Sequence, residues 1–313
     1  MASAKNYLAG IAASTIFGFS FLFSKTALDA LSLEELLFLR FLTAAIALSG
    51  LALAGVVKVD FRGKDLRPLM ATALLQPVLY FVFETQGLKL ADSSTAGIIL
   101  SAIPVAVTGL AALILRERLR PVQIATTLLS FSGVLLVVLF RASGKVGGQP
   151  LGFVFLILSM LCAASFNIAS RYSSRSFKPA EITLFMMWAG TLAFGLLFAL
   201  KAIGAAGSGG YDLAARLGPA ALGSVLYLGL LSSVVAFLMV NYNLSKLKSP
   251  EAAVFANLTT VVSVLAGLLL RGERVLATDL LGGAMIVAGV WGTNVLGARK
   301  ARAAEPSGSA RSG

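Results

Sequence analysis

Ten apolar stretches, each close to the length of a membrane-spanning helix, divide the sequence from end to end. A helix needs about 20 apolar residues to cross the hydrocarbon core of a bilayer. The stretches lie near residues 7–27, 34–56, 68–88, 94–115, 122–140, 151–171, 181–203, 218–244, 250–270 and 276–296. Of the 313 residues, 58% are hydrophobic and 13% are charged, which leaves no length for a large domain outside the membrane. We therefore predict an all-α integral membrane protein with ten transmembrane helices.

The basic residues between the stretches indicate the orientation of the chain. Cytoplasmic loops of membrane proteins carry an excess of lysine and arginine. With the N-terminus inside, 17 basic residues face the cytoplasm and 8 face the other side, and Arg40, inside a stretch, completes the 26. This bias predicts a multi-pass protein of the bacterial inner (plasma) membrane with both termini cytoplasmic. The small, polar segment 301–313 is predicted to be a disordered cytoplasmic tail.

Side chains with catalytic or metal-binding chemistry are scarce. Histidine is absent, and the single cysteine, Cys162, lies inside an apolar stretch. Serine–histidine catalysis, an internal disulfide and a zinc cluster are therefore excluded, and no glycine-rich nucleotide-binding loop is present. In a chain this apolar, the net charge of +12 indicates basic loops at a membrane surface rather than a nucleic-acid partner. We predict no catalytic residue, no metal and no cofactor.

A weak internal repeat relates the two halves of the chain. A shift of 156 residues lays the fourth and fifth stretches on the ninth and tenth, and places Glu117–Arg118 on Glu273–Arg274. Most of the other matches are of the kind that an apolar composition yields by chance, so the charged pair carries the argument. Five spans per copy would insert the second copy in the opposite orientation, as in secondary transporters with a substrate site at mid-membrane. The expected halves are residues 1–143 and 144–300.

Short motifs in both halves resemble the EamA type of the drug/metabolite transporter superfamily. The second half carries, in order, Gly272-Glu273-Arg274-Val275, Asp279, Gly282–Gly283 and Gly289–Val290. The first half carries a degraded copy, Arg116-Glu117-Arg118-Leu119, then Gln123, Thr126–Thr127 in place of two glycines, and Gly133–Val134. The element Phe38-Leu39-Arg40-Phe41 is also similar. The resemblance implies two inverted five-helix repeats around a central cavity and the transport of small metabolites. Within the superfamily, the chain is similar to the YddG-like exporters of aromatic amino acids.

Polar side chains recur along one face of the third stretch. Gln76, Tyr80 and Glu84 are spaced at i, i+4 and i+8. A carboxylate inside the membrane is costly unless water or a cation reaches it. We predict that the three side chains line the central cavity. The alternative is that Glu84 reaches the interface or pairs with a neighbour such as Arg40.

Aromatic and amide side chains in other stretches are further candidates for the cavity. Phe83, Phe166 and Trp188 are predicted to form an aromatic box with Tyr80, because rings bind other rings and cations. Ordinary packing in the core or against lipid is the alternative for any one ring. Asn167 is a large amide about one turn from the interface, and it is also predicted to line the cavity.

One more amide and two prolines complete the candidate residues. Asn257 lies deep in the ninth stretch, where cavity lining and helix–helix hydrogen bonding are both open. Pro77 and Pro104 each remove an intrahelical hydrogen bond and are predicted to kink their helices, with either a gating or a purely structural role.

Together these features favour a carrier that moves a small-molecule substrate by alternating access. Export of amino acids, aromatic ones in particular, is the specific expectation. The alternatives are export of other small metabolites or drugs and, in other classes, a channel or a membrane-embedded enzyme. The sequence does not set the oligomeric state and is compatible with a monomer.

Overall fold

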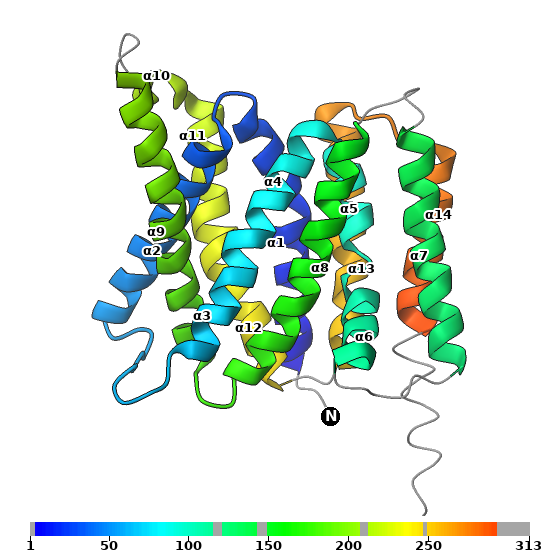
Figure 1. The fold of residues 1–313 in the computed structure, drawn as a ribbon, viewed down its shortest axis with the longest axis horizontal. Helices are drawn as coiled ribbons and strands as arrows, with labels where there is room; N and C mark the ends of the chain where they lie inside the picture. The colour runs from blue at the N-terminus through cyan, green and yellow to red at the C-terminus, as the bar shows by residue number, and fades with distance from the viewer. Residues whose placement is uncertain (1–3, 115–120, 143–148, 207–211, 247–248, 293–313) are drawn as a thin grey trace, which may run out of the picture.

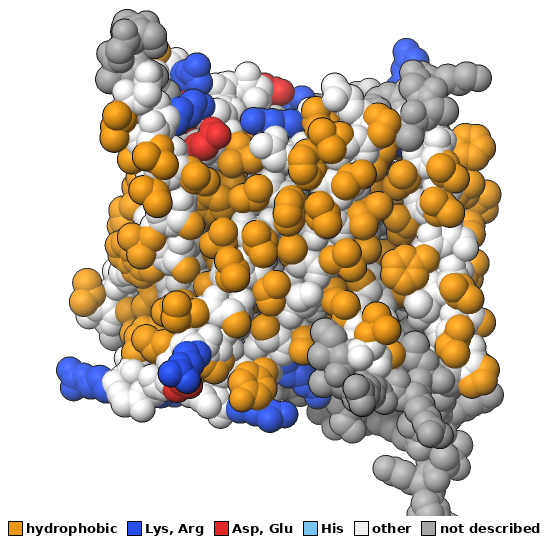
Figure 2. All heavy atoms as spheres, viewed as in Figure 1, with side chains coloured by type: hydrophobic (Ala, Val, Ile, Leu, Met, Phe, Trp, Pro, Cys, Tyr) orange, Lys and Arg blue, Asp and Glu red, His pale blue; other side chains and the backbone are white. Residues whose placement is uncertain are grey.

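The computed structural model describes residues 4–114, 121–142, 149–206, 212–246 and 249–292, and its regular elements are helices that run along a common direction (Figure 1). In these ranges, eight helices are long and apolar enough to cross a membrane, and two shorter apolar helices bring the spans to ten. Hydrophobic side chains form a broad band between two rims that carry charged ones (Figure 2). The predicted all-α fold with ten spans is confirmed.

Seven spans are single helices. They are α1 (Ala4–Leu28), α2 (Leu33–Leu53), α7 (Pro121–Ala142), α8 (Pro150–Ser173), α9 (Pro179–Ala206), α13 (Ser249–Arg271) and α14 (Ala277–Trp291). Prolines begin α7, α8 and α9, where the missing N–H would have no partner in the helix. A capping box begins α2, with the Ser32 amide donating to Glu35 Oε2 at 2.9 Å and the Glu35 amide donating to Ser32 Oγ at 3.5 Å.

Three spans are interrupted helices, and a short helix α10 (Leu213–Arg216) precedes the last of them. The third span consists of α3 (Arg67–Ala73), the wide-turn segment η1 (Leu74–Leu79) and α4 (Tyr80–Leu90). The fourth consists of α5 (Ser93–Leu100) and α6 (Ile103–Ile114). The eighth consists of α11 (Pro219–Leu226), the wide-turn segment η2 (Tyr227–Ala236) and α12 (Phe237–Lys246).

Two of the interruptions lie next to the prolines named above. Gln76 has the non-helical angles φ −151° and ψ 117°, and the peptide bond between Gln76 and Pro77 is cis. The break between α5 and α6 falls at Ser101 and Ala102, so that Pro104 lies in the first turn of the new helix. A proline is tolerated there because the N–H that it lacks would be unpaired. Whether either break moves during function stays a prediction.

The contacts between helices are related by the internal repeat. When each span is exchanged with its counterpart in the other half, the same pattern of contacts results. α2 packs against α9, and α7 packs against α14, so these spans pair with their own counterparts. α4 packs against α8, and the equivalent contact in the other half is that of η2 and its flanking helices with α1. α1 packs against α13, and the equivalent contact is that of α8 with α5 and α6. α1 begins and α14 ends at the same end of the bundle (Figure 1). This is the arrangement that an inverted duplication produces.

Glycines bring α7 and α14 into close contact. A Cβ atom on Gly133 would lie 2.6 Å from the carbonyl oxygen of Gly282, and one on Gly289 would lie 2.5 Å from that of Thr126. Small residues permit such close approach between membrane helices. The shift of 156 residues places Thr126 on Gly282 and Gly133 on Gly289, so the two crossings are related by the repeat.

Candidate functional site

The guanidinium of Arg40 lies buried where α2 meets η2, with 2% of the residue exposed. Its Nε donates to Ser233 Oγ at 2.9 Å, and its Nη2 donates to Ser232 Oγ at 2.8 Å. Ser20 Oγ of α1 lies 2.9 Å from Ser232 Oγ. Helices of both halves thus meet at one charged side chain.

An aromatic ring and a carboxylate also lie near this guanidinium. The Cζ atom of Arg40 is 4.2 Å from the centroid of the Phe81 ring, within cation–π range. Glu84 is equally buried and acts electrostatically on Arg40, yet no ion pair joins the two among the described residues. Glu84 Oε2 instead accepts a hydrogen bond from Thr85 Oγ1 at 3.4 Å. The structure therefore shows no ion pair between Glu84 and Arg40, one of the alternatives considered from the sequence.

Phe237, the first residue of α12, is the centre of a cluster of rings. Its centroid lies 5.4 Å from that of Phe17, 6.3 Å from that of Phe81 and 6.4 Å from that of Phe166. Phe81 in turn meets Tyr80 edge-on at 4.7 Å. We call these five residues the central aromatic cluster; it draws on α1, α4, α8 and α12.

The structure corrects the predicted aromatic box. Tyr80 and Phe166 are buried in the central aromatic cluster, but two of the proposed rings do not join it. Phe83 stacks on Phe155 of α8 at 6.2 Å. Trp188 is 41% exposed on α9, and its Nε1 donates to Ser49 Oγ at 3.0 Å. In the described part of the chain, neither residue makes a ring contact with the cluster.

The remaining cavity candidates have different surroundings. Gln76 is buried at the break in the third span, so a regular i, i+4 helical relation to Tyr80 does not hold. The amide of Asn167 is partly buried and donates to the Ala163 carbonyl of its own helix at 2.7 Å. Asn257 belongs to α13, but its side chain lies outside the described residues.

Glu273 of the repeat motif caps a helix of the other half. It follows Gly272, whose φ of +64° favours glycine. The Glu273 carboxylate accepts hydrogen bonds from the amides of Ser93 and Ser94 at 3.0 and 2.9 Å, and from their hydroxyls at 2.6 and 2.5 Å. The carboxylate therefore pairs the amides that α5 leaves unpaired at its N-terminus. Its repeat counterpart, Glu117, lies outside the described residues.

The Glu273 cap is expected to make stability depend on pH. Burial raises the pKa of its carboxyl, but the hydrogen bonds from Ser93 and Ser94 outweigh burial and hold the pKa below its usual value. A carboxylate with a depressed pKa in the folded state stabilises above its unfolded pKa, and loses this contribution as the pH falls through the folded value. Glu273→Gln should therefore lower the unfolding temperature at pH 7, and the difference from wild type should shrink in acid. The exposed Asp65→Asn is the control, and a difference that is constant from pH 7 to pH 3 would contradict the prediction.

The corner between α4 and α5, residues 88–94, is tied to other helices as well. Lys25 Nζ of α1 donates to the carbonyls of Leu88 and Ala91, both at 2.5 Å. The amide of Gln149, just before α8, donates to the Leu90 carbonyl at 2.9 Å. Cationic and N–H donors thus pair carbonyls that the end of α4 leaves open.

Arg141 connects the same corner to α14. Its side chain is fully buried at the end of α7. Nη1 pairs with Asp92 Oδ2 at 2.5 Å, while Nε and Nη2 pair with the two oxygens of Asp279 at 3.0 and 2.5 Å. Nη2 also donates to the Arg274 carbonyl at 2.9 Å. Charged groups therefore hold this end of the bundle together.

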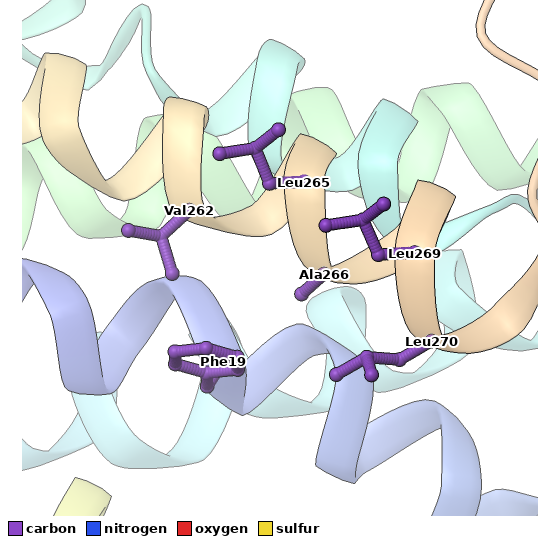
Figure 3. A pocket seen from close by; sticks show the side chains of 6 residues that line it. All are labelled: Phe19, Val262, Leu265, Ala266, Leu269 and Leu270. Atoms are coloured by element: carbon purple, nitrogen blue, oxygen red, sulfur yellow. The ribbon is translucent and has the colours of Figure 1, made fainter.

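An apolar groove of about 280 Å³ lies between α1 and α13 (Figure 3). The described residues that line it are Phe19, Val262, Leu265, Ala266, Leu269 and Leu270. Their side chains offer no hydrogen bond to a polar molecule. The buried cluster around Arg40 and Glu84 is therefore the better candidate for a metabolite site.

Two inverted halves with a buried polar and aromatic cluster between them define a membrane transporter of the inverted-repeat class. A model of the EamA-like transporter family matches residues 4–139 and 150–295. The chain belongs to the EamA-like transporter family, as the motifs indicated. It is a transporter rather than an enzyme.

Relatives agree with this family, and one solved structure shares the fold. The protein named uncharacterized transporter YcxC of Bacillus subtilis (strain 168) is 35% identical over 289 residues, 92% of each chain. The probable terminal-alkyne amino-acid exporter of Streptantibioticus cattleyicolor is 26% identical over 267 residues, 85% of each chain. A crystal structure of a protein 18% identical superposes with a TM-score of 0.69, covering 96% of this chain and 99% of the other. At that identity, the likeness shows the fold alone.

Proposed function

We propose that this transporter exports amino acids, aromatic ones in particular, across the bacterial inner membrane by alternating access. The observation that carries the proposal is the buried group of Arg40, Glu84 and the central aromatic cluster, to which both halves contribute. The charged carboxylate and ammonium groups of a free amino acid would find the polar side chains there, and its aromatic side chain would find the rings. The name of the Streptantibioticus cattleyicolor relative, a probable amino-acid exporter, supports the same substrate class.

The proposal assigns the two repeats to residues 1–143 and 144–300, which would rock about the site and open it to one side at a time. Residues 301–313 form a cytoplasmic tail in this proposal and lie outside the described residues. Gln76, Tyr80, Glu84 and Phe166 are the predicted lining residues that it retains, because all four are buried.

The proposal is tested with purified protein in liposomes and an imposed pH gradient as a second variable. Labelled phenylalanine should enter with saturable kinetics, and unlabelled aromatic amino acids should compete with it. Flux linear in concentration, accompanied by single-channel currents, would instead identify a pore. Saturable transport of other metabolites without any amino-acid flux would refute the proposed substrate class.

Both termini are proposed to be cytoplasmic, because basic residues favour that side by 17 to 8. A reporter that is active only in the cytoplasm should therefore be active when fused after Gly313, and a periplasmic reporter should be inactive there. A fusion in the connection 207–211 should give the reverse pattern. Periplasmic activity at Gly313 would show that the orientation is inverted.

A further inference from the structure

The Arg40 guanidinium has more hydrogen-bonding capacity than its neighbours use. An arginine offers five N–H donors in a planar fork. Ser233 and Ser232 occupy Nε and one donor of Nη2, and Phe81 lies against the group. Within the described part of the chain, Nη1 donates no hydrogen bond. One edge of the fork is therefore left for a further acceptor.

The positive charge of this group also lacks a contacting anion among the residues that the structure describes. Buried charges are normally paired, since an isolated ion in a medium of low dielectric is costly. Both hydrogen-bonded partners of Arg40 are neutral serines, and Glu84 influences the guanidinium without forming an ion pair. The protein thus buries a guanidinium and a carboxyl group without pairing them, with the Phe81 ring of the central aromatic cluster against the guanidinium.

We infer that Arg40 binds the carboxylate of the transported molecule, an inference that rests on the proposed amino-acid transport. A guanidinium fork matches a carboxylate through two parallel charge-assisted hydrogen bonds. Ser232 and Ser233 are positioning residues that hold the fork in place. Glu84 faces the ammonium group, so a zwitterion bridges the two charges that the protein keeps apart.

Three related ligands separate the carboxylate from the rest of the molecule. Phenylalanine carries both charged groups, 3-phenylpropanoate lacks the ammonium, and phenethylamine lacks the carboxylate. Their binding is measured by equilibrium dialysis with the purified full-length protein, as wild type and as Arg40→Gln, Arg40→Lys and Arg67→Gln. Arg67 is a matched control because its side chain is 91% exposed. Thermal unfolding of each variant reports whether it is folded.

Arg40→Gln should weaken binding of phenylalanine and 3-phenylpropanoate by about tenfold or more, the loss of one charge-assisted contact. Phenethylamine binding should change by less than about twofold, because it has no carboxylate to lose. Arg40→Lys keeps the charge without the fork and should give a smaller loss confined to the two carboxylates. If Arg40→Gln does not fold, Arg40→Lys is compared with wild type instead. Arg67→Gln should bind all three ligands like wild type.

The outcomes distinguish this inference from the proposed function. Equal weakening of all three ligands in the folded Arg40 variants would overturn the inference, while phenylalanine binding by wild type would still support amino-acid transport. Arg40-dependent binding of 3-phenylpropanoate without phenylalanine binding would support the inference and overturn the amino-acid assignment. Failure of wild type to bind either carboxylate would overturn both.

Discussion

Replacing Arg141 with methionine is expected to lower the free energy of unfolding by about 3–5 kcal/mol. The substitution keeps an apolar stem but leaves the buried carboxylate of Asp279 and the partly buried one of Asp92 without their cation. An unpaired charge in such surroundings is among the few single changes with effects of this size. The measurement is denaturant-induced unfolding in mixed micelles, with the exposed Arg67→Met as control.

A second substitution tests the cause of that loss. Asp279→Asn removes the charge but keeps an oxygen that can accept the Leu276 amide, which Asp279 Oδ2 accepts at 2.8 Å at the start of α14. Added to Arg141→Met, it should restore part of the lost stability, since no charge then remains unpaired at that position. An Arg141→Met protein as stable as the Arg67→Met control would show that the network contributes little.

Changing Glu84 to glutamine is expected to reduce phenylalanine transport by about tenfold to a hundredfold, the size of a lost charge-assisted hydrogen bond. The change keeps the shape of the side chain and removes its charge. Transport of 3-phenylpropanoate, which has no ammonium group, should change far less. The measurement is initial flux into liposomes at several pH values, with Asp65→Asn as an exposed control.

The pH profile separates two roles for Glu84. A residue that binds ammonium affects amino acids selectively, whereas a proton carrier affects every substrate and its loss removes the pH dependence of flux. Unchanged flux together with an unchanged profile in Glu84→Gln would remove this residue from the site. The proposed lining role of the third span would then lose its main support.

The fold was predictable because hydrophobic length alone determines it in a membrane. The ten stretches found in the sequence lie within a few residues of the helices and helix groups of the structure. The breaks beside Pro77 and Pro104 followed from the missing amide hydrogen. The sequence could not give the wide-turn segment η2, which contains no proline.

The candidate site was predictable only where a residue type is rare inside a membrane. Glu84 and Tyr80 stood out against apolar neighbours, but Ser232 and Ser233 did not, because small hydroxyls commonly bond within their own helix. Phe237 had no signal among 20 phenylalanines. Arg40 did have a signal in the sequence, since a lone arginine inside an apolar stretch is costly.

The rotation of each helix about its own axis was the other feature that the sequence did not indicate. Trp188 is exposed while the adjacent Met187 is fully buried, so one residue along α9 separates the lipid-facing side from the interior. A helix that is apolar on all sides gives no amphipathic pattern from which to read that rotation. For this reason the sequence did not show that Trp188 lies outside the aromatic cluster.

The glycine crossings of α7 and α14 limit how the two repeats can move. Gly133 and Gly282 place backbone against backbone, and the side chains of Val137 and Ile286 pack closely beside the contact, so little space is left to absorb a displacement. Sliding one helix past the other would drive larger residues into that contact. Rotation of one helix about the contact would not drive larger residues into it. In the proposed alternating-access cycle, this pair would therefore be the pivot at one edge of the bundle, about which the other spans rotate while their own contacts break and re-form.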